Sequence, residues 1–273
     1  MRRVACNGAE IPAIGLGTWE LRGEQCAEIV GAALALGYRH VDTAQMYENE
    51  GEVGAAIRAS GVPRDEIFLT TKVWRDRLGA GELERSVEES LERLDTGYAD
   101  LVLIHWPNAA VPLQETLEAL ARVRRDGRAR HIGISNFPSA MIDDAVAVSP
   151  EPIVTNQIEY HPYLDQSKVV ETCRKHGISV TAYCPIARAR VVGEPVIEEI
   201  AAKYGRTPAQ VTLHWLIQQP GGIAVPRTQS KSRLAENLDV EGFTLTDEEM
   251  AAIAALAEPG GRIVNAAWAP DWD

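Results

Sequence analysis

The sequence repeats one unit: a short, continuously apolar segment followed by a segment whose apolar residues have helical spacing. Eight such units follow one another at a period of about 30 residues. Apolar segments without alternation are typical of parallel strands that are covered on both faces. Eight of them predict a (β/α)8 TIM barrel, with strands at residues 13–16, 38–42, 67–72, 99–105, 129–135, 153–158, 179–183 and 223–226.

Helical spacing and capping signals predict the segments that cover this barrel. They comprise residues 24–36, 51–60, 83–94, 113–125, 139–148, 166–176, 208–218 and 231–238. Two further helices are expected at residues 195–204 and 246–257, and Asn7-Gly8 predicts an N-terminal β-hairpin over residues 4–11. We therefore expect one barrel domain over residues 1–273.

An open, doubly wound sheet is the alternative to the barrel. Its dinucleotide-binding form carries a glycine-rich turn after the first strand. The chain has Gly15-Leu16-Gly17 there, but Glu20 stands where the third glycine would be. The fingerprint is incomplete, and this favours the barrel.

Composition limits the classes of function. A net charge of −12 argues against nucleic acid and anionic membranes as partners. The four cysteines form no CxxC motif, no metal-ligand cluster is recognised, and no apolar run has the length of a signal peptide or a membrane span. No long exposed apolar stripe calls for a partner chain. We expect a cytoplasmic, monomeric enzyme without a metal.

Four chemically competent side chains stand at or just after the ends of predicted neighbouring strands. Asp42 ends the second strand, Tyr47 follows five residues later, Lys72 ends the third strand, and His105 ends the fourth. Sites in TIM barrels lie at the carboxyl ends of the strands, so these side chains are expected to converge.

An Asp, a Lys and a Tyr in contact have an electrostatic use. The carboxylate of Asp42 would keep the ammonium of Lys72 charged, and the ammonium would favour the phenolate of Tyr47, lowering its pKa. Such a tyrosine can protonate a carbonyl oxygen, which His105 could hydrogen-bond. The alternative is a structural ion pair beside a core histidine, but four such residues at adjacent strand ends favour a site.

A proton donor beside a carbonyl still needs a nucleophile, and a cofactor could supply hydride. Residues 224–233 carry three basic side chains and no acidic one, between the last strand and a helix, where barrels commonly bind phosphate. Trp19, Trp74 and Trp106 each follow a predicted strand end, which suggests an aromatic wall of a substrate pocket.

These residues and their neighbours make the chain resemble the aldo-keto reductase superfamily, from Ile14 to about Leu256. Within it, the chain most resembles the bacterial 2,5-diketogluconate reductases, which also reduce methylglyoxal, and its ending, residues 262–264 and 269–273, resembles their B-type. The resemblance is carried by Asp42-Thr43-Ala44 through Asn49-Glu50, Thr70-Thr71-Lys72, Leu103-Ile104-His105-Trp106-Pro107, Gly133-Ile134-Ser135-Asn136-Phe137, Asn156-Gln157-Ile158-Glu159-Tyr160-His161-Pro162, and Arg233 through Glu236-Asn237.

The resemblance implies NADPH-dependent reduction of small aldehydes, α-dicarbonyls or keto-sugars, with a catalytic tetrad of Asp42, Tyr47, Lys72 and His105. It implies that the nicotinamide carboxamide is held by Ser135, Asn136 and Gln157, and that Tyr183 stacks on the ring. The 2′-phosphate would be held by Arg227, Thr228 and Arg233, and the adenine would contact Glu236 and Asn237.

The chain departs from the family pattern at three places. Arg227 stands where Lys usually begins the phosphate clamp, Cys184 replaces a common Ser, and residues 186–190 replace a glycine- and serine-containing loop near the pyrophosphate. Arg188 and Arg190 are candidates for contacting the pyrophosphate instead. Two other functions remain open: a Schiff-base lyase or aldolase using Lys72, and a non-enzymatic NADP-binding regulatory subunit.

Overall fold

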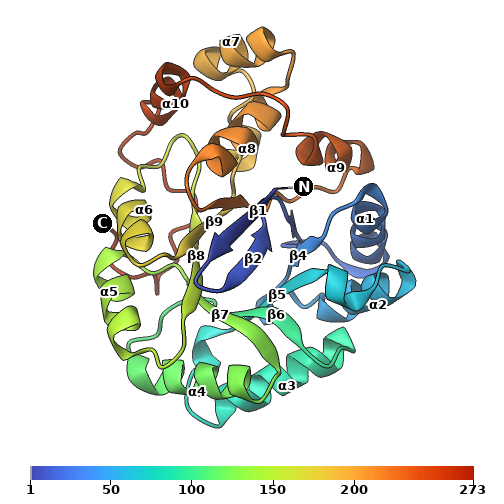
Figure 1. Ribbon diagram of the computed structural model, residues 1–273, viewed down its shortest axis with the longest axis vertical. Coiled ribbons are helices and arrows are strands. Elements are labelled where there is room, and N and C mark those ends of the chain that lie inside the picture. Colours follow the sequence, from blue (N-terminus) through green and yellow to red (C-terminus); the bar gives the residue numbers. More distant parts are fainter. Residues whose placement is uncertain (1) are drawn as a thin grey trace.

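The computed structural model describes residues 2–273, and eight parallel strands form its centre (Figure 1). Continuous burial of the longer strands on both faces explains their unbroken apolar sequences. The strands are hydrogen-bonded in chain order: β3 (Leu16–Gly17), β4 (His40–Asp42), β5 (Phe68–Val73), β6 (Ala99–Ile104), β7 (Ala129–Ser135), β8 (Ile153–Glu159), β9 (Ser179–Tyr183) and β10 (Gly222–Ala224).

The barrel closes between its first and last strands. Ile14 forms a parallel bridge with Ala224, and the Gly15 N–H donates to the Ala224 carbonyl at 2.9 Å. A Cβ at Gly15 would lie 2.7 Å from the His40 ring, so only glycine fits there. The expected first strand, residues 13–16, is displaced to Leu16–Gly17, because residues 13–15 pair with β10 across the closure instead.

The predicted N-terminal hairpin is present, with β1 (Arg3–Cys6) and β2 (Ala9–Pro12) antiparallel. Asn7 and Gly8 have φ values of 42° and 87°, the left-handed pair that a tight hairpin turn requires. The Asn7 amide donates to the carbonyls of Ile153 and His176, at 2.7 and 3.1 Å. The hairpin is thereby fixed across the end of the barrel where the strands begin (Figure 1).

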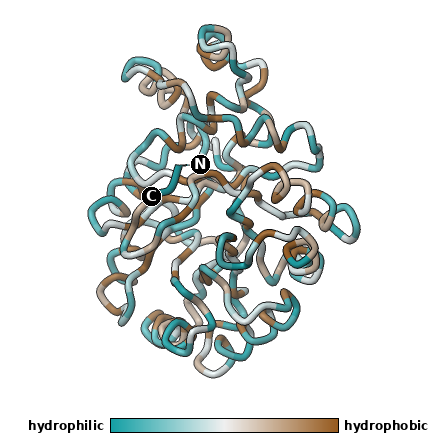
Figure 2. The backbone as a smooth tube through the Cα atoms, turned by 45° about the vertical axis from the view of Figure 1, so that its right-hand side comes forward, coloured by the Kyte–Doolittle hydropathy of each residue, from teal (hydrophilic) through white to brown (hydrophobic). Residues whose placement is uncertain are grey.

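Helices surround the sheet, and their hydropathy alternates along each one, as amphipathic helices require (Figures 1 and 2). Two helices exceed the one-per-strand pattern, as predicted: α7 and α10, which are joined by the Lys203–Glu249 ion pair at 2.6 Å. The ten α-helices of the described part of the chain are α1 (Gly23–Leu36), α2 (Glu50–Ala59), α3 (Glu82–Leu94), α4 (Leu113–Arg125), α5 (Ser139–Val148), α6 (Ser167–Lys175), α7 (Pro195–Tyr204), α8 (Pro208–Gln218), α9 (Lys231–Leu238) and α10 (Asp247–Ala254).

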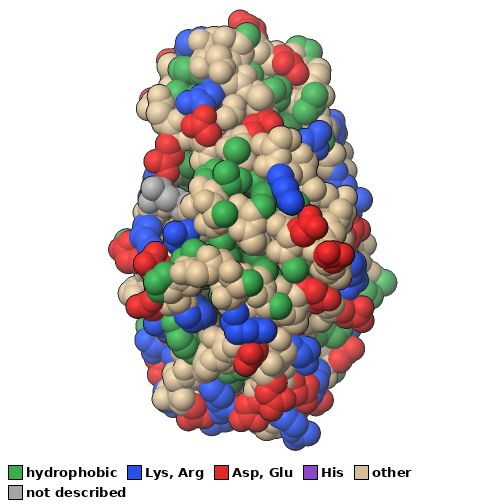
Figure 3. All heavy atoms as spheres, turned by 90° about the vertical axis from the view of Figure 1, so that its right-hand side faces the viewer, with side chains coloured by type: hydrophobic (Ala, Val, Ile, Leu, Met, Phe, Trp, Pro, Cys, Tyr) green, Lys and Arg blue, Asp and Glu red, His purple; other side chains and the backbone are tan. Residues whose placement is uncertain are grey.

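Charged side chains of both signs are interspersed on the face formed around α1 and α2 (Figure 3). Several pairs are partly buried, among them Arg64 with Asp100 at 2.8 Å. Asp100 is almost fully buried at the start of the barrel, where it also accepts a hydrogen bond from the Leu69 N–H. In the part of the chain that the structure describes, no helix is long and apolar enough to cross a membrane.

Candidate active site

Three of the four predicted catalytic side chains meet at the carboxyl ends of β4 and β5. The Lys72 Nζ lies 2.6 Å from Asp42 Oδ1 and 3.2 Å from the Tyr47 hydroxyl, and it donates to the Thr43 carbonyl at 2.9 Å. Tyr47 reaches this position from a short 3-10 turn, η1 (Gln45–Tyr47), directly after β4. An ammonium has three N–H donors, so Lys72 is fully satisfied.

Burial dominates the electrostatics of this group. Lys72 is completely buried, which lowers its pKa from 10.5, while Asp42 acts in the opposite direction and favours the charged form. The ammonium and the carboxylate therefore form a buried pair that depends on its hydrogen bonds, and removal of either charge would leave the other uncompensated.

The expected lowering of the Tyr47 pKa is wrong for this structure. Burial raises the pKa of Tyr47 well above 10, and the charges of Asp42 and Cys184 act in the same direction. The nearby ammonium can be inferred from the sequence, whereas the burial of the phenol depends on the tertiary structure. Tyr47 consequently carries its proton at neutral pH, and its oxygen accepts the Lys72 hydrogen bond, so the hydroxyl hydrogen can point elsewhere.

His105 completes the predicted group from the end of β6. Its ring packs edge-on against the Tyr47 ring, with centroids 5.6 Å apart, and its backbone carbonyl accepts from the Asn136 amide at 3.0 Å. Burial, aided by the Lys72 charge, lowers the pKa of His105 well below 6.5. The imidazole is therefore neutral at physiological pH, and its buried Nδ1 has no hydrogen-bond partner within residues 2–273.

A second hydrogen-bonded group continues from β7 to β9. The Ser135 hydroxyl donates to the Gln157 carbonyl at 2.8 Å, and the Tyr183 hydroxyl donates to Asn136 Oδ1 at 2.8 Å. Asn136 has a φ of 63°, a left-handed conformation that is uncommon outside glycine and recurs at functional sites. The four side chains that the resemblance implied for the nicotinamide thus lie beside the tetrad.

A side-chain contact between the two groups was not predicted. The Gln157 amide donates to Asp42 Oδ2 at 2.7 Å, so both carboxylate oxygens of Asp42 are occupied, one by Lys72 and one by Gln157. The two residues are 115 positions apart, and no local sequence signal could pair them.

Aromatic side chains surround the tetrad. Trp19 lies 5.0 Å from the Tyr47 ring and Trp74 lies 5.2 Å from the His105 ring, centroid to centroid. Trp106 is largely buried. Two tryptophans that were not predicted as part of the wall add a second layer: Trp268 packs on Trp74 and Trp272 packs on Trp106.

Both of these additional tryptophans belong to residues 262–273, which we call the strap. It follows α10 without regular secondary structure. No role in the pocket was predicted for this tail, although its ending carries part of the family resemblance. Trp268 remains 41% exposed, so the outer layer of the wall is open to solvent.

The basic segment after β10 approaches the loop after β3. The Arg227 Nε donates to the Trp19 carbonyl at 3.0 Å, and a Cβ at Gly17 would meet the Val225 carbonyl at 2.7 Å.

Thr228 is buried and accepts from the Ser230 N–H. Arg233 is exposed on α9, Asn237 is buried there, and Glu236 accepts from the Thr207 hydroxyl at 2.6 Å.

The loop after β9 is locally strained. Ala187, Arg188 and Ala189 all have φ values between 46° and 72°, and Cys184 has a φ of 50°. Burial raises the pKa of the Cys184 thiol to about 11, which makes this thiol a poor nucleophile at neutral pH. Arg190 pairs with Glu258 at 2.8 Å and lies over the Tyr163 ring. Its guanidinium is therefore directed to the segment before the strap.

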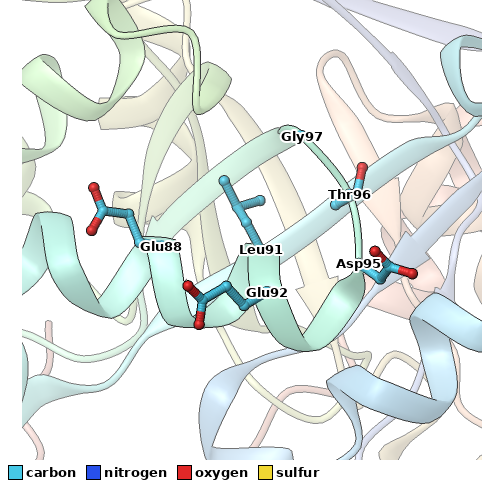
Figure 4. Close-up of a pocket in the computed structure, with 6 residues that line it drawn as sticks. All are labelled: Glu88, Leu91, Glu92, Asp95, Thr96 and Gly97. Atoms are coloured by element: carbon cyan, nitrogen blue, oxygen red, sulfur yellow. The ribbon is translucent and has the colours of Figure 1, made fainter.

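A hollow of about 460 Å³ lies elsewhere, at the end of α3 (Figure 4). It sits next to the start of β6, whereas the tetrad lies at the ends of the strands. Three of its six lining residues are exposed acids, and the lining is formed by Glu88, Leu91, Glu92, Asp95, Thr96 and Gly97. It contains none of the residues selected from the sequence.

The fold and the site define a TIM barrel whose strand ends hold a buried Asp–Lys pair, a protonated tyrosine and a neutral histidine. A family model described as the Aldo/keto reductase family matches residues 13–258. The chain belongs to the aldo/keto reductase family.

Relatives and solved structures agree with this assignment. The chain is 44% identical to the methylglyoxal reductase DkgB of Escherichia coli O157:H7, over 96% of this chain and 99% of that protein. A crystal structure of a protein assigned as a 2,5-diketo-D-gluconic acid reductase B has a TM-score of 0.98 and 50% identity, covering 100% of this chain and 98% of the other. A Gox0644 variant in complex with NADPH has a TM-score of 0.90 and 39% identity, with 96% of each chain covered.

Proposed function

We propose that this protein reduces small aldehydes, α-dicarbonyls or keto-sugars to alcohols, with NADPH as the hydride donor and Tyr47 as the proton donor. The observation that carries the proposal is the position of Lys72 Nζ, which contacts both Asp42 and the Tyr47 hydroxyl inside a fully buried site. The relatives named methylglyoxal reductase and 2,5-diketo-D-gluconic acid reductase support this substrate range.

The residues present fit a nicotinamide dinucleotide. Ser135, Asn136, Gln157 and Tyr183 offer amide and hydroxyl groups and an aromatic ring beside the tetrad. Arg227 and Arg233 supply positive charge around the start of α9, suited to a phosphate. When bound, the nicotinamide would supply the hydride, and the Gox0644 complex supports NADPH as the cofactor.

The protein's own part is to bind and protonate the carbonyl oxygen. Tyr47 would give up its hydroxyl proton to this oxygen, while the ammonium of Lys72, 3.2 Å from the phenol oxygen, stabilises the developing phenolate. A neutral His105 would donate a hydrogen bond to the same oxygen. The aromatic wall would exclude water from the reacting atoms.

Schiff-base chemistry at Lys72 is the second candidate, because burial lowers the lysine pKa. The geometry disfavours it, since Asp42, Thr43 and Tyr47 occupy all three donors of the ammonium. Incubation with an aldehyde and borohydride, without nicotinamide, should therefore trap no adduct on Lys72. A non-enzymatic regulatory subunit would oxidise no NADPH with any carbonyl compound.

Tyr47→Phe tests the central role. Reduction of methylglyoxal should fall by about 10²–10⁴, because general acid catalysis is lost, whereas NADPH affinity should not change. Tyr204→Phe is the matched control, because this hydroxyl bonds to Thr244 and Glu249 far from the tetrad. Turnover of Tyr47→Phe within about fivefold of the parent would exclude Tyr47 as the acid.

A further inference from the structure

A buried carboxylate outside the tetrad ties the strap to the barrel. Glu159, the last residue of β8, is completely buried and accepts hydrogen bonds from the backbone N–H groups of Ile263 and Val264, at 2.5 and 2.7 Å. His161 Nε2 lies 3.0 Å from the same carboxylate and is also completely buried. The reaction proposed above does not use this carboxylate.

The chain before these two amides is also fixed. A Cβ at Gly261 would lie 1.8 Å from the Tyr163 carbonyl, so only glycine can pass there. At the far end, the Asp273 carboxylate accepts from the Ser139 N–H at 2.8 Å, at the start of α5. The strap is therefore held at two places, and Glu159 is the buried one.

Between these two places the strap reaches the pocket wall. Trp268 contacts Trp74 at 5.9 Å, and Trp74 contacts His105 at 5.2 Å, centroid to centroid. Trp272 contacts Trp106 at 6.1 Å, and the Arg262 guanidinium lies 3.6 Å over the Trp272 ring. The strap segment is otherwise irregular, so its position depends on these contacts and on the two amide hydrogen bonds.

We propose that Glu159 is a positioning residue for substrate selection: its carboxylate sets the strap so that Trp268 and Trp272 back the wall formed by Trp74 and Trp106. A carboxylate suits this task because it only accepts hydrogen bonds and can serve two N–H donors at once. This inference rests on the proposed carbonyl reduction, since the wall is a substrate wall only in that case.

Glu159→Gln is the sharpest variant, because it keeps the shape but replaces one acceptor oxygen by a donor that faces an amide. Hydrogen exchange at the amides of Ile263 and Val264 should accelerate by about tenfold or more, the loss of one charged hydrogen bond. The value of kcat/KM for phenylglyoxal should fall about tenfold, because KM rises while kcat is retained. The value of kcat/KM for methylglyoxal and the affinity for NADPH should change less than about twofold.

Two further variants make the result specific. Glu258→Gln is the matched control, because this half-exposed carboxylate pairs with Arg190 and its side chain holds no strap amide. Its exchange and kinetics should match the parent. Trp268→Ala combined with Glu159→Gln should lower kcat/KM for phenylglyoxal by clearly less than the product of the two single effects, because both act through the strap.

The exchange measurement needs no turnover, so it tests the hydrogen bonds even if the proposed reaction is wrong. Unchanged exchange at Ile263 and Val264 in Glu159→Gln would overturn the proposal. Equal losses of kcat/KM for phenylglyoxal and methylglyoxal would also overturn it, as would independent, additive effects of Glu159→Gln and Trp268→Ala.

Discussion

Lys72→Met isolates the charge on which the proposed proton transfer depends. At 3.2 Å from the phenol oxygen, a full charge pair is worth about 5 kcal/mol at an effective dielectric constant near 20. Only part of this energy develops in the transition state, so we expect kcat/KM to fall by about 10³, within the range of general acid catalysis. The Tyr47 pKa, already raised by burial, should rise further.

The same substitution leaves Asp42 buried without its cation, although Gln157 still donates to it. Breaking such a pair costs about 3–5 kcal/mol of stability, which could imitate a catalytic loss. The double variant Lys72→Met/Asp42→Asn removes both charges and should regain most of the lost stability but none of the activity. Comparing the two variants therefore separates catalysis from folding.

The assay is NADPH oxidation with methylglyoxal, followed at several pH values, with melting temperatures measured for each variant. A deuterium isotope effect from labelled NADPH should confirm that hydride transfer limits the rate. A folded Lys72→Met enzyme whose kcat/KM equals that of the parent would refute this role of the ammonium. It would equally be refuted if the double variant regained activity together with stability.

Arg233→Ala should weaken NADPH binding about tenfold to a hundredfold and leave NADH binding unchanged. The control, Arg174→Ala on α6, should affect the binding of neither cofactor. Equal losses of NADPH and NADH affinity in Arg233→Ala, measured by fluorescence titration, would contradict a 2′-phosphate contact at Arg233. Trp74→Ala should raise KM for aromatic aldehydes more than for methylglyoxal, and an unchanged ratio of kcat/KM would place Trp74 outside the pocket. Because the pKa of His105 is lowered and that of Tyr47 is raised, kcat/KM of the parent enzyme should not change between about pH 6 and 9. A change of kcat/KM with a midpoint near about pH 6.5 would show that His105 titrates there.

Several features of the fold follow from local sequence. The hairpin could be predicted because Asn7-Gly8 takes the two left-handed conformations that its turn needs. Thr246 and Glu249 form the capping box that starts α10. Strands that are apolar throughout must be covered on both faces of the sheet. Together with the repeat of one helix after each of eight strands, this favours the barrel.

The grouping of Asp42, Lys72 and His105 could be predicted for the same reason. Each lies within one residue of the end of a parallel strand, and neighbouring parallel strands end at the same edge. The contacts among the side chains are thus a consequence of strand order. Their roles in catalysis remain a proposal, which the variants above test.

Other features depend on residues that meet only after folding. The pairing of Gln157 with Asp42, the hold of Glu159 on the strap and the packing of Trp268 on Trp74 join distant segments with no shared local pattern. The pKa of Tyr47 belongs to the same group, because burial, which the sequence does not report, outweighs the nearby ammonium. Periodicity and strand order thus determined where the reactive groups lie, whereas desolvation and long-range packing, which require the complete tertiary structure, decided their protonation and the shape of the wall around them.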